Sequence, residues 1–227
     1  MVRTVLFLTV LFMIAFATSC GVQNTGVGID VDSKPLILPK DTGARPKIIA
    51  FGDSLTAGFG LEEFESYPYL LQQKLKADGY DYEVVNAGVS GDTSLGGLER
   101  IDWTLETDNA KILILELGAN DMLRGVPPEK MRQNLDKILE KAKAKNVQVL
   151  LCGMIAPPTM GLEYQRAFSN AFPDLAEKHK VHYLPFLLDG VALDKDLNQA
   201  DGIHPNATGT RMMMENVYKE LRPLLTK

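Results

Sequence analysis

The sequence predicts an α/β fold in which a five-stranded parallel sheet lies between two layers of helices. Short apolar runs of strand length alternate with amphipathic segments of helix length along the chain. The run at 111–117 is nearly all apolar, which is typical of a central strand covered on both faces. The composition, with 45% hydrophobic and 23% charged residues among 227, is that of a globular protein. Such alternation favours a three-layer α/β/α sandwich.

The first strand and the first helix are predicted from the residues at their ends. Residues 47–51 form a short apolar run that stops at Gly52, which indicates a buried strand. In the next segment we expect Ser66 to cap a helix, Pro68 to occupy its first turn and Gly79 to end it.

The remaining elements continue the alternation. Strands are predicted at 82–86, 111–117, 147–152 and 181–184, and helices at 94–107, 128–144, 164–179 and 206–221. The helix at 94–107 has an apolar face made by Leu95, Leu98, Ile101 and Leu105. We expect Trp103, on the same helix, to lie in the core.

The first twenty residues resemble the signal of a bacterial lipoprotein. Residues 5–17 form an apolar run broken only by Thr9, too short for a membrane span, which needs about 20 residues. Small residues and Cys20 follow, as in a lipobox, although Ala17 stands where Leu is more usual. We therefore expect a signal peptide at 1–19, a lipid on Cys20, a tether at 20–45 and one domain at 46–227. The alternative is an ordinary cleaved signal with an incidental cysteine.

The signal and the overall charge indicate where the protein works and with what. A lipid on Cys20 would attach the chain to a membrane of the bacterial cell envelope. It would also leave Cys152 without a partner, and this residue, inside an apolar run, is expected to be a small buried hydrophobe. With 24 basic and 29 acidic residues, the net charge of −5 excludes a general cationic surface for nucleic acid. We expect a monomer.

Glycine and short polar residues gather in the loops that follow the predicted strands. These loops are residues 51–58, 86–93, 118–121 and 201–205. In open parallel sheets the working site lies beyond the carboxyl ends of the strands, so the four loops should converge on one site.

The loops contain one nucleophile–base set. Ser54 directly follows a strand, where a nucleophile would be exposed at a tight turn. His204 is the candidate base, and Asp201, three residues earlier, is close enough to accept the proton on its Nδ1. The Gly91 N–H and the Asn120 amide can donate to an oxyanion.

Four blocks in this order resemble the SGNH (GDSL) esterase family. They are Gly-Asp-Ser-Leu at 52–55, Asn-Ala-Gly-Val-Ser-Gly-Asp-Thr at 86–93, Gly-Ala-Asn-Asp at 118–121 and Asp-Gly-Ile-His-Pro at 201–205. The resemblance covers about 47–225. With Leu-Arg-Gly at 123–125, the chain is most similar to the thioesterase I, lysophospholipase L1 and arylesterase group.

This resemblance implies a flavodoxin-like fold and a set of roles. Ser54 attacks, His204 is the base and Asp201 orients it. The oxyanion hole is formed by the Ser54 N–H, the Gly91 N–H and Asn120. No metal or cofactor is implied.

Other catalytic readings fit the residues less well. The α/β-hydrolases share the order Ser…Asp…His, but Thr56 stands where their nucleophile elbow requires glycine. A divalent-metal site is conceivable from Asp53, Asp92, Asp121 and Asp201. We expect the first three instead to brace the loops through hydrogen bonds to backbone.

The predicted function is a serine esterase that cleaves acyl esters or thioesters through an acyl-enzyme on Ser54. The substrate pocket is predicted from Asp53, Leu55, Met122, Leu123, Pro157 and Met160. Small acyl esters, lysophospholipids and acyl thioesters are all compatible with the resemblance. The alternatives are a carbohydrate-ester deacetylase and an inactive lipoprotein that binds acyl chains or lipid.

Overall fold

The computed structural model describes residues 45–227, which belong to one compact unit. The predicted signal peptide, Cys20 and all of the tether except Arg45 lie outside the described residues.

The centre of the domain is a five-stranded sheet in which every pair of neighbours is parallel. Its order is β2-β1-β3-β4-β5. The strands are β1 (Lys47–Gly52), β2 (Glu83–Gly88), β3 (Ala110–Glu116), β4 (Gln148–Cys152) and β5 (His182–Leu184). This confirms the predicted α/β fold.

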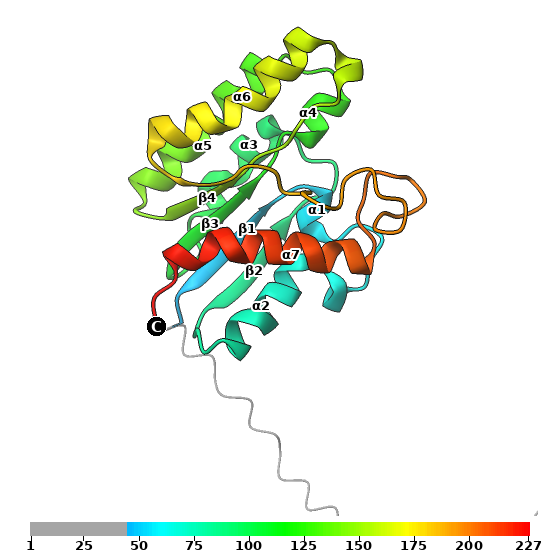
Figure 1. Ribbon diagram of the computed structural model, residues 1–227. Coiled ribbons are helices and arrows are strands. Elements are labelled where there is room, and N and C mark those ends of the chain that lie inside the picture. The colour runs from blue at the N-terminus through cyan, green and yellow to red at the C-terminus, as the bar shows by residue number, and fades with distance from the viewer. Residues whose placement is uncertain (1–44) are drawn as a thin grey trace, which may run out of the picture. The chain divides into compact units, whose positions relative to one another are not determined.

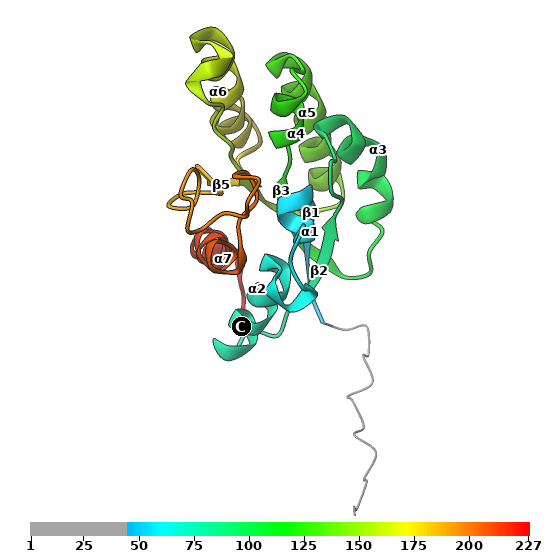
Figure 2. The ribbon, with the colours of Figure 1, turned by 90° about the vertical axis from the view of Figure 1, so that its right-hand side faces the viewer.

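Helices cover both faces of the sheet (Figures 1 and 2). On one face lie α2 (Tyr67–Ala77) and α7 (Ala207–Leu221), which pack on each other. On the other lie α3 (Ser94–Thr104), α5 (Pro128–Ala144) and α6 (Leu162–His179). Short turns of 3-10 helix stand at Glu63–Glu65, Pro158–Met160 and Arg222–Leu224.

Two short helices were not predicted, and both follow a strand at the carboxyl edge of the sheet. They are α1 (Ser54–Ala57) and α4 (Ala119–Leu123). Helices of one turn show no amphipathic period, so the sequence pattern cannot reveal them. Figure 2 looks onto this edge, with α1 near the centre of the view.

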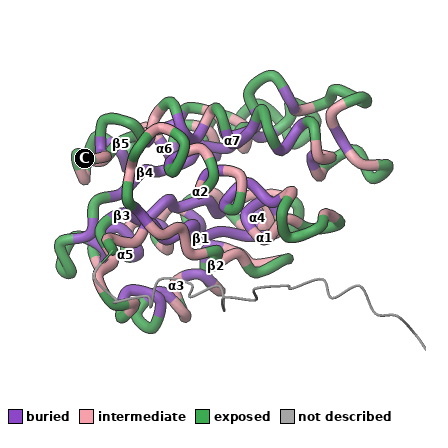
Figure 3. Tube along the Cα trace, turned by 90° about the horizontal axis from the view of Figure 1, so that it is seen from below, coloured by how far each residue is buried: buried purple, intermediate pink, exposed green. Residues whose placement is uncertain are grey.

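The core lies on both sides of the two central strands (Figure 3). Ile48–Phe51 of β1 and 112–115 of β3 are fully buried. Cys152, in β4, is also fully buried, and burial raises the pKa of its thiol well above the usual range. The expectation of a small buried hydrophobe is confirmed.

The prediction that Trp103 lies in the core is wrong, because its residue is 79% exposed. The face of α3 that packs inward is formed by Ser94, Gly97, Ile101 and Thr104. Trp103 is two positions from Ile101, about 200° around the helix. A Cβ on Gly97 would lie 2.2 Å from a methyl carbon of Leu117, so close packing here needs glycine. The spacing of the leucines did not reveal this face, because the residues that form the face are mostly small.

None of the helices in residues 45–227 is both long and apolar enough to cross a membrane.

Candidate active site

Ser54 is presented by the turn between β1 and α1. Asp53 is the N-cap of α1, and its Oδ1 accepts the Leu55 N–H at 3.0 Å. Ser54 is therefore the first residue of the helix, where a backbone N–H has no acceptor within the helix. The turn therefore presents both the hydroxyl and the backbone N–H of Ser54 to a substrate.

The structure brings Ser54, His204 and Asp201 into one chain of hydrogen bonds. Ser54 Oγ lies 2.9 Å from Nε2 of His204, although 150 residues separate them in the sequence. Nδ1 of His204 lies 2.7 Å from Oδ2 of Asp201. A histidine held in this way can take a proton from the serine while the carboxylate stabilises the resulting imidazolium.

Asp201 is itself held by its neighbours. Its Oδ1 accepts the Ile203 N–H at 3.0 Å and the His204 N–H at 3.1 Å. The hydrogen bond with the His204 side chain, followed by these two backbone bonds, lowers the pKa of Asp201 to about 2. The carboxylate is therefore ionised throughout the neutral range.

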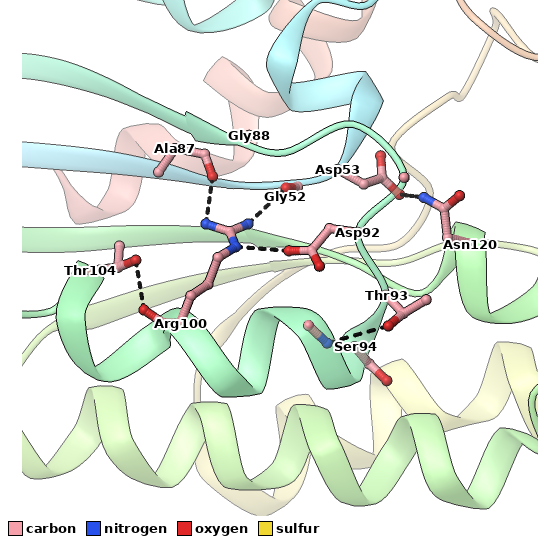
Figure 4. Close-up of polar contacts among 12 residues, drawn as sticks. Gly52, Asp53, Ala87, Gly88, Asp92, Thr93, Ser94, Arg100, Thr104 and Asn120 are labelled. Carbon is pink, nitrogen blue, oxygen red and sulfur yellow. Dashed lines mark hydrogen bonds and ion pairs between the residues drawn. The ribbon is translucent and has the colours of Figure 1, made fainter.

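Gly91 and Asn120 line the same cleft as Ser54 and His204. Gly91 has a φ of +83°, a conformation that favours glycine. Its carbonyl accepts a hydrogen bond from Arg124 at 2.6 Å. Nδ2 of Asn120 donates to Oδ2 of Asp53 at 2.9 Å (Figure 4). A side-chain amide carries two hydrogens, so the second remains for a substrate oxygen.

A buried acid, Glu116 at the end of β3, supports this turn from beneath. Its Oε2 accepts the Asp53 N–H at 3.1 Å and the Thr56 hydroxyl at 2.8 Å. The side chains of Glu116 and Asp53 are both fully buried. Burial, and then repulsion by Asp53, raises the pKa of Glu116 well above its usual range. Burial also raises the pKa of Asp53 to about 6. Of the two acids, Glu116 is therefore the one that holds a proton more readily.

This acid requires the glycine that precedes Asp53. A Cβ on Gly52 would lie 2.3 Å from Oε2 of Glu116 and 2.2 Å from Oγ1 of Thr56. The first glycine of the Gly-Asp-Ser-Leu block therefore leaves room for the buried carboxyl group.

Arg100 of α3 joins the carboxyl ends of β1 and β2 to the loop after β2 (Figure 4). Its guanidinium donates to the carbonyls of Ala87 and Gly52 at 2.8 and 3.0 Å and pairs with Asp92 at 2.8 Å. Asp92 thus acts through an ion pair, whereas hydrogen bonds to backbone were expected. Asp121 does brace a loop as expected, because its Oδ2 accepts the Ser94 N–H at 2.7 Å.

Sequence reasoning missed Arg100 and Glu116. A charged residue inside a helix usually lies on a solvated face, and an acid at the end of an apolar strand gives no sign of its partners. Only the position of Glu116, inside a run that is otherwise buried, could have indicated a special environment.

A cleft of about 540 Å³ opens beside Ser54 and His204. Five of the six predicted pocket residues line it: Asp53, Leu55, Met122, Leu123 and Pro157. Met160, in the 3-10 helix Pro158–Met160, is not among the lining residues. A smaller cavity of about 370 Å³, lined by Val147 and Val181 among others, contains none of the site residues.

Much of the cleft wall comes from residues that were not predicted. The ring of Phe59 lies 4.7 Å from the imidazole of His204. The others are apolar side chains from loops: Met154, Phe186, Leu188, Leu193 and Ile203. Residues 185–200, in the loop before α7, were not predicted as part of the site because they have no regular pattern.

The four aspartates considered for a metal do not form a site. Among residues 45–227 there is no group of three or more His, Cys, Asp or Glu side chains that could hold a metal ion. Asp53 and Asp121 instead accept from backbone N–H groups, and Asp92 pairs with Arg100.

The model of the GDSL-like lipase/acylhydrolase family matches residues 50–212, most of the domain. The chain belongs to this family. Esterase TesA of Pseudomonas aeruginosa is 41% identical over 190 residues, which are 84% of this chain and 94% of that protein. The thioesterase 1/protease 1/lysophospholipase L1 of Escherichia coli is 36% identical, over 84% of this chain and 90% of that one.

A solved crystal structure of TesA has the same fold. It superposes with a TM-score of 0.76 at 42% identity, covering 79% of this chain and 99% of that one. This member of the GDSL-like lipase/acylhydrolase family is therefore a carboxylic ester hydrolase.

Proposed function

We propose that the enzyme cleaves fatty acyl esters and thioesters, lysophospholipids among them, through an acyl-enzyme on Ser54. The observation that carries this proposal is the apolar cleft of about 540 Å³ that opens at the serine–histidine pair. Pockets of about 300–1,000 Å³ hold small-molecule ligands, and an acetyl group would fill little of this one.

The hydrogen bonds supply each step of the reaction. Ser54 Oγ attacks the acyl carbonyl while Nε2 of His204 takes its proton, and the carbonyl electron pair moves to oxygen. The Ser54 N–H, the Gly91 N–H and the free hydrogen of the Asn120 amide stabilise this oxyanion. The tetrahedral intermediate collapses, and His204 passes the proton to the departing alcohol or thiol.

Water completes the cycle. His204 takes a proton from a water molecule, whose oxygen attacks the acyl-enzyme carbonyl. Collapse of the second intermediate releases the fatty acid and returns the proton to Ser54. Asp201, with its low pKa, stays ionised and stabilises the imidazolium in both halves.

The wall of the cleft favours an acyl chain over a sugar. Apolar side chains dominate the lining, including Leu123, Met154, Ile155 and Phe186. Recognition of a sugar would require several polar groups placed toward its hydroxyls. The name of the Escherichia coli relative, which includes thioesterase and lysophospholipase, supports the same choice.

The proposal includes a place in the cell. The lipobox-like residues before Cys20 support a lipid anchor and a location in the bacterial cell envelope. There the enzyme would meet lysophospholipids directly, and we propose that it acts as a monomer. Incorporation of labelled palmitate into the full chain, and its loss in Cys20→Ala, tests the anchor.

The activity is tested with p-nitrophenyl esters from acetyl to palmitoyl, with Ser54→Ala beside the wild type. An optimum at medium or long chains that vanishes in the variant supports the proposal. An acetyl optimum points instead to small esters or sugar acetates. Equal rates in both proteins at every length mean background hydrolysis and favour a protein that only binds lipid.

A further inference from the structure

The mouth of the cleft is surrounded by exposed apolar side chains. Five residues that line it are also large, apolar and exposed; we call them the apolar rim: Phe59, Leu123, Ile155, Leu193 and Ile203. Each comes from a different stretch of chain, namely the end of α1, the end of α4, the segment after β4, and two parts of the loop before α7. Apolar groups that converge from separate loops form a surface suited to an apolar partner.

Leu193 is the most prominent member of the rim. Its residue is 94% exposed, and its φ of +66° is a backbone conformation that side chains with a Cβ seldom adopt. Exposure to water and this conformation both disfavour leucine in the isolated domain. Burial of the side chain against an apolar partner would offset the first of these costs.

The loop holds Leu193 firmly in this position. Buried Asn198 donates from Nδ2 to the carbonyls of Val191 and Asp194, each at 2.7 Å, and so ties the chain on both sides of Leu193. The Ala192 N–H also donates to the Leu188 carbonyl at 3.0 Å. The leucine is thus presented at a fixed point of the surface.

The rim is continuous with the catalytic centre. Ile203 directly precedes His204, and the Phe59 ring lies against the imidazole. An apolar surface that covered the rim would therefore give an acyl chain a path to Ser54 that avoids water.

The charges of the loop that carries Leu193 and Ile203 indicate the kind of apolar surface. The loop before α7 carries one cation, Lys195, against Asp189, Asp194, Asp196 and Asp201. This acidic excess opposes an anionic surface and leaves apolar contact as the attraction. A zwitterionic lipid surface fits both properties.

We propose that the apolar rim docks on the surface of aggregated zwitterionic lipid, with Leu193 inserted. The consequence for catalysis rests on the proposed function, because it assumes that acyl chains enter from the lipid phase. The docking itself does not depend on catalysis, so the two are tested separately.

Docking is measured by co-flotation with vesicles of diether phosphatidylcholine, which an esterase cannot cleave. The protein starts at residue 20, outside the compact unit, and is made without a signal so that Cys20 carries no lipid. Leu193→Asn removes the apolar group and places there a residue that tolerates positive φ, which protects the fold. We expect its affinity for the vesicles to fall about tenfold.

The matched control is Trp103→Asn, which removes another highly exposed apolar side chain, from α3 and away from the cleft. It should bind the vesicles as the wild type does. Equal binding by the wild type and Leu193→Asn, or an equal loss in both variants, would overturn the proposal. A concentration-dependent dimer that Leu193→Asn abolishes, without vesicle binding, would assign the rim to a second copy instead.

Catalysis gives the second readout. Leu193→Asn should lower the rate on p-nitrophenyl laurate carried in the same vesicles about tenfold more than it lowers the rate on dissolved p-nitrophenyl butyrate. If neither protein cleaves laurate while the wild type still binds vesicles, the proposed substrate fails and the docking surface stands.

Discussion

Asn120 donates a hydrogen bond from its side-chain amide to the carboxylate of Asp53 at 2.9 Å. Asp53 accepts a second hydrogen bond from the Leu55 N–H, and its own N–H donates to the buried acid Glu116. The orientation of the amide is therefore determined by residues that do not touch the reacting carbonyl. This relationship gives the predictions below.

Asn120→Ala should lower kcat on the order of 100-fold or more, because one oxyanion donor is worth about 2.7–4 kcal/mol in the barrier. The side chain is only partly buried, so the fold should persist. The rate is measured on a p-nitrophenyl ester, with the circular dichroism spectrum as the control for folding. A change within about tenfold would reject the role of Asn120 as an oxyanion donor.

Asp53→Asn should also reduce kcat, because Asp53 orients the amide of Asn120. The new amide can accept from the Leu55 N–H with its oxygen, but its NH₂ group then faces the Asn120 donor. To pair with that NH₂ group, the Asn120 side chain must turn so that its oxygen faces residue 53. An acceptor atom, in place of the N–H donor, then faces the oxyanion. We expect a loss of about tenfold or more.

A double-mutant cycle separates this route from a general disturbance of the site. If Asp53 acts by orienting Asn120, the substitution Asp53→Asn should cost little in a protein that already carries Asn120→Ala. Fully additive losses would show that the carboxylate works independently of the amide.

Asp53 and Asp201, whose pKa values shift in opposite directions, predict opposite effects of pH on stability. Folding raises the pKa of Asp53 from 3.8 to about 6, so between these values the folded chain binds more protons than the unfolded chain. The free energy of unfolding should therefore fall by about 2–3 kcal/mol as pH rises through this window. Folding lowers the pKa of Asp201 to about 2, so its contribution is present above pH 4 and is lost on further acidification.

Urea unfolding at several values between pH 4.5 and pH 7.5 tests the contribution of Asp53, with Asp53→Asn as the comparison. The difference in stability between variant and wild type should grow in favour of the variant as pH rises, because the amide cannot ionise. A difference that is constant across this range would mean that Asp53 titrates alike in the folded and unfolded states.

The catalytic loops could be predicted because their residue types are unusual where they stand. A glycine-rich turn with Ser54 after an apolar strand, and His204 beside Asp201 in a polar loop, are features of the local sequence. The partners of Glu116 are not, since Asp53 lies 63 positions earlier in the sequence. The positive φ of Leu193 is likewise hidden, because no local pattern marks it.

The same distinction explains the errors outside the site. The apolar spacing predicted a buried face for α3, and Ile101 and Leu105 are buried, but Leu95 is exposed. The face that packs also contains Gly97 and other small residues, and Trp103 lies in water. Periodicity records which residues are apolar and gives no account of how closely two elements approach. The buried part of the site depends on such close approaches, for example that of Glu116 and Thr56 to Gly52.

Glu116 gives the last prediction, from two substitutions of different kinds. Glu116→Gln keeps an oxygen that accepts from the Asp53 N–H and the Thr56 hydroxyl, and it is neutral, as we infer the native side chain to be. Its NH₂ group takes the place of Oε1, which is buried without a hydrogen-bond partner, so we expect a stability between those of the wild type and Glu116→Ala, with most of kcat retained. Glu116→Ala leaves a cavity and two buried donors without an acceptor, so we expect a loss of about 2–5 kcal/mol.

Chemical denaturation and ester hydrolysis are measured together on both variants. A severe loss of stability in Glu116→Gln would mean that the native carboxyl group is ionised in its buried site and that its charge is needed. If Glu116→Gln is stable but nearly inactive, the acid contributes to the reaction itself. Only an active glutamine variant that is clearly more stable than the alanine variant fits a neutral acid that holds the nucleophile turn in place.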